Sequence, residues 1–189
     1  MSRFSNTIDA SVSTIESLRE LETQFDSASV LLIETLQAGG KVMACGNGGS
    51  AADSAHFMTE LLCRLDVERP PLAGIALTND GSFLTAVGND YSFDEIFARQ
   101  VSGLGRHGDA LVGLSTSGNS TNVLRAFEVA KQGGLKTLAL LGRDGGSLAG
   151  VADVELIVPV ESTARIQEAH QVLIHLICAE VQGVIFGPL

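Results

Sequence analysis

His56 and Glu60 place an imidazole and a carboxylate four residues apart in the second quarter of the sequence. In a helix this spacing puts both side chains on one face, one turn apart. An imidazole and a carboxylate arranged in this way can hold a metal ion or transfer protons to and from a substrate. The same spacing is common in exposed ion pairs, so the pair alone leaves both a chemical role and a plain surface role open.

A second set of polar side chains lies late in the sequence, in a segment that is otherwise apolar. Gln167, His170, Gln171 and His175 occur there among aliphatic residues, and the pattern predicts a largely buried helix. Polar groups on a buried helix need partners. Together with the earlier histidine and glutamate, they predict a divalent-metal site of borderline softness, for which zinc is the preferred ion.

The spacing within this second segment does not fix the ligand set. Gln167 and His175 are eight residues apart. They lie about 12 Å apart along a helix, so both reach one ion only if their side chains extend toward each other. His170 or Gln171 could replace either of them. A histidine on an apolar helix is also commonly a hydrogen-bonded core residue, and this alternative stays open.

Two loops rich in glycine and serine each lie between an expected strand and an expected helix. The first is CGNGGS, over 45–50, and the second is STSGNS, over 115–120. Glycine lets the backbone approach a ligand closely, and the helix that follows offers free N–H groups and the positive end of its dipole. Ligands of open α/β sheets bind at this carboxyl edge of the strands. The two loops together therefore predict a phosphate site.

Other phosphate-binding motifs do not fit these loops. Neither loop contains the GxxxxGK[ST] pattern of a P-loop, and the first lacks the third glycine of a GxGxxG dinucleotide motif. Either loop taken alone could be a tight turn with a serine that caps the next helix. The second loop carries more hydroxyl groups than a cap requires, namely those of Ser115, Thr116, Ser117 and Ser120.

The charge of the chain excludes some functions and constrains the phosphate site. The formal net charge is −10 over 189 residues, which argues against a nucleic-acid-binding face. The overall field repels a phosphate, so local neutral donors must hold it. Three scattered cysteines without metal-binding spacing favour reduced thiols in a cytoplasmic protein. The apolar runs are too short, and the N-terminus too polar, to predict a membrane span or a signal peptide.

The elements that must position these residues follow from the hydrophobic pattern. Apolar residues at three- and four-residue steps predict a leading helix over about 5–38 that ends at a glycine pair. This helix either covers its own sheet or packs against another subunit. Short apolar runs predict buried strands over 41–45, 73–77, 110–114, 136–141 and 154–158. Helical stretches fall between them, near 51–65, 93–103, 120–132 and 164–185.

Alternating helices and continuously apolar strands are typical of a parallel sheet that is covered on both faces. We therefore predict an α/β fold, with a five-stranded, parallel, doubly wound sheet in a three-layer α-β-α sandwich. No internal repeat or linker divides the sequence. The prediction is one domain over 1–189, in which 1–38 form an N-terminal oligomerisation helix and 39–189 form the α/β core.

Four segments of the sequence resemble the phosphoheptose isomerases, which belong to the SIS (sugar isomerase) superfamily. The segments are CGNGGSAADSAHFMTELLCR, VGNDYSF, STSGNS and TARIQEAHQVLIH, and the similarity runs from about 41 to 180. The two loops alone are typical of the whole superfamily. The HxxxE that follows the first loop and the RIQExHxxxxH segment are more specific. The resemblance implies the SIS fold.

The resemblance also implies a role for each matched residue. Glu60 and His175 match the acid/base pair of the family. The family's zinc ligands match His56, Glu60, Gln167 and His175. Its substrate-binding residues match Asn47, Gly48, Gly49, Ser50, Glu60, Arg64, Asn89, Asp90, Ser115, Thr116, Ser117, Ser120 and Gln167. One position departs from the family, because Ala164 stands where some members carry an acidic residue.

The implied activity is the conversion of D-sedoheptulose 7-phosphate to D-glycero-D-manno-heptose 7-phosphate through an enediol(ate), with one Zn²⁺ per subunit. The resemblance further implies a cytoplasmic homotetramer that acts in heptose biosynthesis, with sites at subunit interfaces and no nucleic-acid or membrane partner. Two alternatives are a non-catalytic SIS protein of the kind that associates with a replication initiator, and another SIS sugar-phosphate isomerase. Glu60 and His175 favour an enzyme, because the non-catalytic class lacks the acid/base residues.

Overall fold

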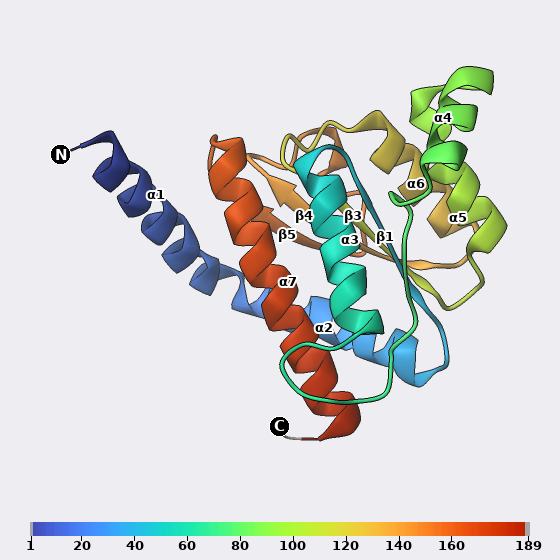
Figure 1. Cartoon of the computed structure of the whole chain (residues 1–189), viewed down its shortest axis with the longest axis horizontal. Helices are drawn as coiled ribbons and strands as arrows, with labels where there is room; N and C mark the ends of the chain where they lie inside the picture. The colour runs from blue at the N-terminus through green and yellow to red at the C-terminus, as the bar shows by residue number, and fades with distance from the viewer. Residues whose placement is uncertain (1, 188–189) are drawn as a thin grey trace.

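A computed structural model of the chain describes residues 2–187, so the two ends of the predicted domain, 1 and 188–189, lie outside the described residues. Within this range five parallel strands form one sheet in the order β2-β1-β3-β4-β5 (Figure 1). The strands are β1 (Val42–Gly46), β2 (Gly74–Ala76), β3 (Ala110–Ser115), β4 (Lys136–Gly142) and β5 (Val154–Val158). Each strand lies where an apolar run predicts it.

The strands divide their side chains between two cores, one on each face of the sheet. On β1, Val42 and Ala44 belong to one core, whereas Met43 and Cys45 belong to the other. The first core is covered by α2 (Glu22–Gln37), α3 (Gly49–Leu62) and α7 (Thr163–Phe186). The second is covered by α4 (Gly81–Asp90), α5 (Ala98–Leu104) and α6 (Thr121–Gln132). The predicted three-layer sandwich is confirmed.

The N-terminal segment forms two helices, so the prediction of a single helix over 5–38 is wrong. α1 (Arg3–Ser17) is followed by a 3₁₀ turn, η1 (Leu18–Leu21), before α2 begins. Leu18 is buried and Leu21 packs against the same core, so packing on the sheet bends the chain where neither glycine nor proline marks a break. α2 covers its own sheet, whereas α1 projects from the body of the molecule (Figure 1).

Two elements on the second face also differ from the prediction. The hydrophobic pattern does not predict α4, and it predicts one helix over 93–103 where the structure has a 3₁₀ turn, η2 (Phe93–Glu95), and then α5. α4 buries little more than Val87, so its periodicity is weak. The sequence feature that could have predicted α4 is its N-cap residue, because the Asp80 carboxylate accepts a hydrogen bond from the N–H of Phe83 at 3.0 Å.

α7 is long and apolar enough to cross a membrane, judged by its length and composition alone. In the structure its residues Ile166, Ala169, Leu173 and Ile177 are buried in the core on the first face of the sheet. Its apolar character is therefore that of a core helix. The same helix carries the late set of polar residues that the sequence singles out.

His170 lies inside this packing, with 0% of its surface exposed. Its Nε2 atom donates to the carbonyl oxygen of Leu141 in β4 at 3.1 Å. Burial lowers the pKa of His170 to about 4, because the charged ring would lose its hydration. His170 is thus the hydrogen-bonded core histidine that the sequence leaves open as an alternative to a metal ligand.

The buried His170 predicts that stability depends on pH. The unfolded chain binds a proton on this ring near pH 6.5, whereas the folded chain binds it only near pH 4, so its contribution is full above pH 6.5 and is lost as the pH falls toward 4. The loss amounts to at most about 3 kcal/mol. Denaturant unfolding from neutral to acid pH should give a shallower fall for His170→Leu than for the native chain. Parallel curves would contradict this assignment.

Candidate active site

The two glycine- and serine-rich loops meet at the carboxyl edge of the sheet. β1 and β3 are neighbours, with Gly46 paired to Leu114, so the loops over 45–50 and 115–120 leave adjacent strands. β2 lies on the other side of β1, so the strand order reverses at this point. A crevice at such a reversal is the usual ligand site of an open α/β sheet.

The first loop owes its shape to glycine at two positions. Gly48 has a φ of +56°, a left-handed value that residues with a side chain rarely adopt, and it caps the N-terminus of α3. A Cβ atom on Gly46 would lie 2.6 Å from the carbonyl oxygen of Ser50. The tight turn directs the free N–H groups of the first turn of α3, which includes Gly49 and Ser50, toward the carboxyl edge.

The second loop holds its hydroxyl groups in a hydrogen-bonded network. The Oγ atoms of Ser115 and Ser120 lie 2.9 Å apart, and Ser117 Oγ accepts a hydrogen bond from the N–H of Asn119 at 3.2 Å. Thr116 is half-buried beside β4. α6 begins directly after Ser120, so this loop also combines hydroxyl groups with the free N–H groups of a helix N-terminus.

A third loop, which follows β4, supports the second. Gly118 has a φ of +66°, and a Cβ atom there would lie 2.1 Å from the carbonyl oxygen of Gly145. Asn119 Oδ1 accepts a hydrogen bond from the N–H of Ser147 at 3.0 Å, in the 3₁₀ turn η3 (Gly146–Leu148). These contacts leave the hydroxyl-bearing loop little freedom to move.

Asn47 and Asn122 form a reciprocal amide pair that joins the first loop to the helix after the second. Asn47 Nδ2 donates to Asn122 Oδ1 at 2.8 Å, and Asn122 Nδ2 donates to Asn47 Oδ1 at 2.9 Å. The sequence pattern does not single out Asn122. The feature that could have revealed Asn122 is its position, since it is a polar residue on the buried face of α6, directly after the loop. The pair sets the separation of the two halves of the predicted phosphate site.

α3 and α7 lie side by side on one face of the sheet (Figure 1). Residues of the two helices face each other in steps along the seam between them. The pairs are Gly49 with Gln167, Asp53 with Gln171, and His56 with His175. Successive pairs are about one helical turn apart on each helix. The polar residues of α7 therefore form three levels that lead from the first loop toward the end of α3.

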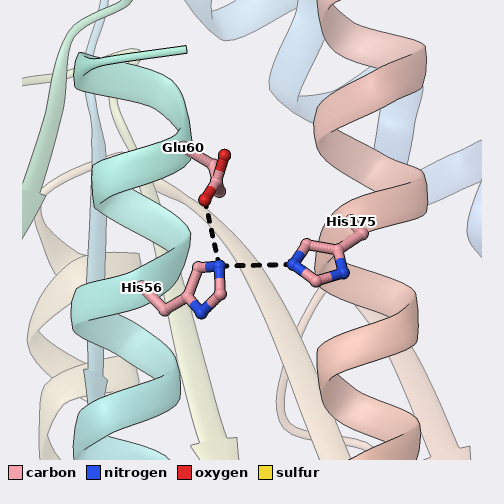
Figure 2. A group of neighbouring side chains, drawn as sticks. All are labelled: His56, Glu60 and His175. Atoms are coloured by element: carbon pink, nitrogen blue, oxygen red, sulfur yellow. Dashed lines mark hydrogen bonds and ion pairs between the residues drawn. The ribbon is translucent and has the colours of Figure 1, made fainter. Parts of the chain in front are cut away.

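His56, Glu60 and His175 converge at the third level of this seam (Figure 2). His56 Nε2 lies 3.0 Å from Glu60 Oε1 and 3.2 Å from His175 Nε2. One ligand atom from each of the three residues lies within 4.8 Å of the others. The two helices thus bring together both members of the predicted acid/base pair and three of the four predicted metal ligands.

The donor set of this group suits a divalent ion of borderline softness. Two imidazole Nε2 atoms face each other, so their contact requires either a proton on one of them or a cation between their lone pairs. Two imidazole nitrogens and a carboxylate oxygen are a ligand combination typical of zinc. His56 is partly exposed, so an ion and a substrate can reach the group from solvent.

The remaining polar residues of α7 have other partners. Gln171 donates to Asp53 and His170 donates to Leu141, so neither of these alternatives joins the group around His56. The amide of Gln167 fills the space against Gly49, where a Cβ atom would lie 2.0 Å from its Nε2 atom. Gln167 thus lies beside the first loop, and its part as a fourth metal ligand stays a prediction.

Asp53 is a buried carboxylate between the first loop and the group around His56, and the sequence pattern does not single it out. Its exposed fraction is 7%, and within residues 2–187 its Oδ2 atom has no hydrogen-bond partner. Burial raises the pKa of Asp53, while the hydrogen bond from Gln171 and the nearby His56 act in the opposite direction. A carboxylate one turn before His56 favours positive charge at the level where the ligands converge.

Three of the predicted substrate-binding residues have hydrogen-bond partners outside both loops and outside the group of metal ligands. Arg64 is exposed and contacts its own loop, where it donates to the carbonyl oxygen of Asp66 at 2.9 Å. Asn89 donates to Asp90 at 2.8 Å, and both are exposed at the end of α4. In the described part of the chain no hydrogen bond joins these residues to the rest of the site, so their roles stay predictions.

The chain is similar to known proteins over most of its length. A family model described as SIS domain matches residues 3–142. The chain is 47% identical over 186 residues to a phosphoheptose isomerase from Shewanella loihica, covering 97% of this chain and 93% of the relative. It is 52% identical over 163 residues to a phosphoheptose isomerase from Helicobacter pylori, covering 86% and 85%. The solved phosphoheptose isomerase from Neisseria gonorrhoeae superposes with a TM-score of 0.91 at 44% identity, covering 96% of this chain and 97% of that one.

The fold and the two loops define an SIS-domain protein, and the matching family model covers most of the chain. At 47% to 52% identity over most of their length, the relatives narrow this class, and the chain belongs to the phosphoheptose isomerase family.

Gly49→Ala tests the contact between the first loop and α7. The added methyl group would displace the Gln167 amide, which is the end of a flexible side chain, so the fold should survive. Alanine is more stable than glycine in a helix by about 0.5–1 kcal/mol, so Tm should stay the same or rise while KM for a sugar phosphate rises. Gly118→Ala is the contrasting variant, because it meets backbone and should lower Tm. An unchanged KM for Gly49→Ala would exclude Gln167 from the site.

Proposed function

We propose that the chain is an aldose–ketose isomerase that converts D-sedoheptulose 7-phosphate to D-glycero-D-manno-heptose 7-phosphate in heptose biosynthesis. The observation that carries the proposal is the convergence of Glu60 and His175 on His56. His56 and Glu60 lie on α3, which begins at the first loop, and His175 lies on α7. Its membership of the phosphoheptose isomerase family supports the choice of a seven-carbon substrate. The non-catalytic alternative does not explain why an acid and a base meet here.

The phosphate group of the substrate is bound by the two loops. Their donors are the hydroxyl groups of Ser50, Ser115, Ser117 and Ser120 and the N–H groups at the starts of α3 and α6. These donors are neutral or backbone groups, which lets an acidic chain of net charge −10 hold an anion. The proposed lining also includes Asn47, Gly48, Gly49, Thr116 and Gln167, while Arg64, Asn89 and Asp90 contact the sugar hydroxyl groups or the active site of a neighbouring subunit.

α3 sets the distance between phosphate binding and chemistry. Ser50 and Glu60 are ten residues apart on this single helix, which corresponds to about 15 Å along its axis. A phosphate fixed at the start of the helix therefore holds the other end of the sugar near Glu60. Binding at the remote phosphate then lowers the entropic cost of aligning the reacting carbons.

Glu60 and His175 exchange the protons of the isomerisation. Glu60 removes a proton from C1 of the ketose while Nδ1 of His175, the ring nitrogen that does not face His56, gives a proton to the C2 oxygen, which produces the enediol. Glu60 then returns its proton to C2 and His175 takes the proton of the C1 hydroxyl group, which leaves the aldose. Glu60 Oε1 already faces His56, so Oε2 is the oxygen proposed to carry the substrate proton.

We further propose that the group holds one Zn²⁺, with His56, Glu60 and His175 as ligands and Gln167 as the fourth. When bound, the ion would act as a Lewis acid toward the substrate oxygens. In this proposal His56 has no separate part in proton transfer, and its position between Glu60 and His175 supports a role as a ligand. For Gln167 to join, its amide must leave Gly49 and extend toward His175.

We propose a cytoplasmic homotetramer in which subunit boundaries complete the sites. Within α1, the exposed side chains of Phe4, Ile8, Val12 and Ile15 form an apolar stripe that suits burial against another subunit. Of the predicted oligomerisation segment 1–38, α1 is therefore the part that serves this role, because α2 packs on its own sheet. The three cysteines are free, as expected in a reducing compartment, and burial raises the pKa of Cys45 and Cys178 to about 12.

The direct test is to incubate the purified chain with D-sedoheptulose 7-phosphate and follow the aldose by NMR. Glu60→Gln keeps the shape of the side chain but removes the base, so kcat should fall by about 10²–10⁴-fold with an unchanged circular dichroism spectrum. A chelator should also abolish turnover, and added Zn²⁺ should restore it. Near-native activity in Glu60→Gln would show that another group is the base, and no aldose from the native chain would overturn the proposed function.

Ile8→Glu with Val12→Glu tests the proposed assembly. Two carboxylates in the apolar stripe of α1 should prevent burial against another subunit, so light scattering should report a smaller species. Ser13→Glu is the matched control, because Ser13 is exposed on the same helix outside the stripe. If the double variant keeps the native mass, α1 is not part of the interface.

A further inference from the structure

Arg69 is a buried cation that the proposed reaction does not use. Its exposed fraction is 7%, although it lies in the irregular segment between α3 and β2. The guanidinium group donates to the carbonyl oxygens of Glu60, Leu61 and Pro70, the last two at 2.8 Å and 2.9 Å. Burial lowers the pKa of Arg69, so the fold carries a cost for placing this charge here.

Two of these acceptors belong to the last turn of α3. The final carbonyl groups of a helix lack partners within the helix and carry the negative end of its dipole. Arg69 donates hydrogen bonds to the carbonyl groups of Glu60 and Leu61 and brings a positive charge to this end of the helix. One of the two peptides that it fixes therefore belongs to Glu60 itself, the residue proposed as the base.

The same guanidinium group is tied to α7 through Gln182. Arg69 Nε donates to Gln182 Oε1 at 3.0 Å, and Gln182 Nε2 donates to the carbonyl oxygen of Leu65 at 3.0 Å. Gln182 is only 1% exposed. It follows His175 by seven residues, or two turns, so it lies on a similar face of α7.

We propose that Arg69 and Gln182 are positioning residues that hold Glu60 at a fixed separation from His175. The bridge runs from the backbone of Glu60 through one guanidinium group and one amide to the helix that carries His175. This inference rests on the proposed function, in which Glu60 and His175 act on one substrate. It explains why a cation is buried at this end of the seam. The Leu61 carbonyl oxygen also accepts from the N–H of Leu72 at 2.9 Å, but an apolar residue in place of Arg69 would remove the hydrogen bond to the Glu60 carbonyl group.

Gln182→Met and Gln182→Glu separate positioning from simple stabilisation. Methionine has a similar volume but cannot accept the Arg69 hydrogen bond, whereas glutamate keeps the acceptor for Arg69 and the length of the side chain and loses the hydrogen bond to Leu65. Misplacement of a catalytic group by about 1 Å can cost about 100-fold in rate, so we expect kcat of Gln182→Met to fall by at least about tenfold with KM unchanged. Gln182→Glu should restore most of that kcat.

A second measurement does not depend on turnover. Residues that orient metal ligands typically change metal affinity by about 10–100-fold when they are altered, so Gln182→Met should bind Zn²⁺ at least about tenfold more weakly in a chelator competition. Val181→Ala is the matched control, because Val181 is buried next to Gln182 in the sequence of α7. The variant should lower Tm while it leaves the hydrogen bonds of Arg69 in place. Should Gln182→Met fail to fold, Arg69→Lys provides the same test, since lysine keeps the charge but cannot reach all the acceptors at once.

The outcomes distinguish this inference from the proposed function. A lower kcat and a weaker Zn²⁺ affinity in Gln182→Met, with both near native in Val181→Ala, would support positioning. A native kcat and Zn²⁺ affinity in Gln182→Met, with only Tm reduced, would overturn it and leave the bridge as a structural cap. If the native chain does not isomerise the sugar phosphate, the proposed function fails, and the Zn²⁺ affinities alone still decide whether the bridge positions the ligands.

Discussion

The packing of α3 against α7 is the constraint on which the site depends. His56 and Glu60 come from one helix and His175 from the other, so the group exists only while the two helices keep their register. Beneath the polar seam, Phe57 and Leu61 of α3 share a core with residues of α7, and this apolar contact sets the register. A slip of one turn would move His175 by about 5.4 Å and separate the rings. The geometry of the proposed catalytic group is in this sense a property of the hydrophobic core.

The electrostatics of the molecule are arranged around an anionic substrate in an acidic chain. The loops use hydroxyl and amide groups in place of lysine and arginine. Arg69 instead binds carbonyl groups at the end of α3, away from the loops. Asp53 adds negative potential to the seam. The two loops at the start of α3 therefore offer neutral donors, and the group around His56, further along the same helix, favours a cation. In the proposed binding mode, a phosphosugar that lies along the helix has its phosphate at the neutral end and its reacting carbons at the other.

Much of the fold could be predicted because the five strands are short, apolar and separated by recognisable helices. The break at η1 could not, because it accompanies the packing of Leu18 and Leu21 into a core made by residues far away in the sequence. Within the site, the spacing of His56 and Glu60 revealed a shared face, but their meeting with His175 depends on helix packing that no local pattern encodes. Asn122, Asp53 and Arg69 escaped notice for the same reason, since each has partners far away in the sequence.

The amide pair between Asn47 and Asn122 has a consequence for which isosteres the fold tolerates. Each amide offers one donating and one accepting edge, and the two hydrogen bonds form because these edges are opposed. An aspartate at either position has almost the same shape but presents two acceptors, so oxygen would face oxygen across the gap. The loops would then be pushed apart by a change that barely alters the volume, and the added negative charge would lie beside the proposed phosphate site. The contact between Asn47 and Asn122 therefore depends on the polarity of the two side chains as well as on their shape.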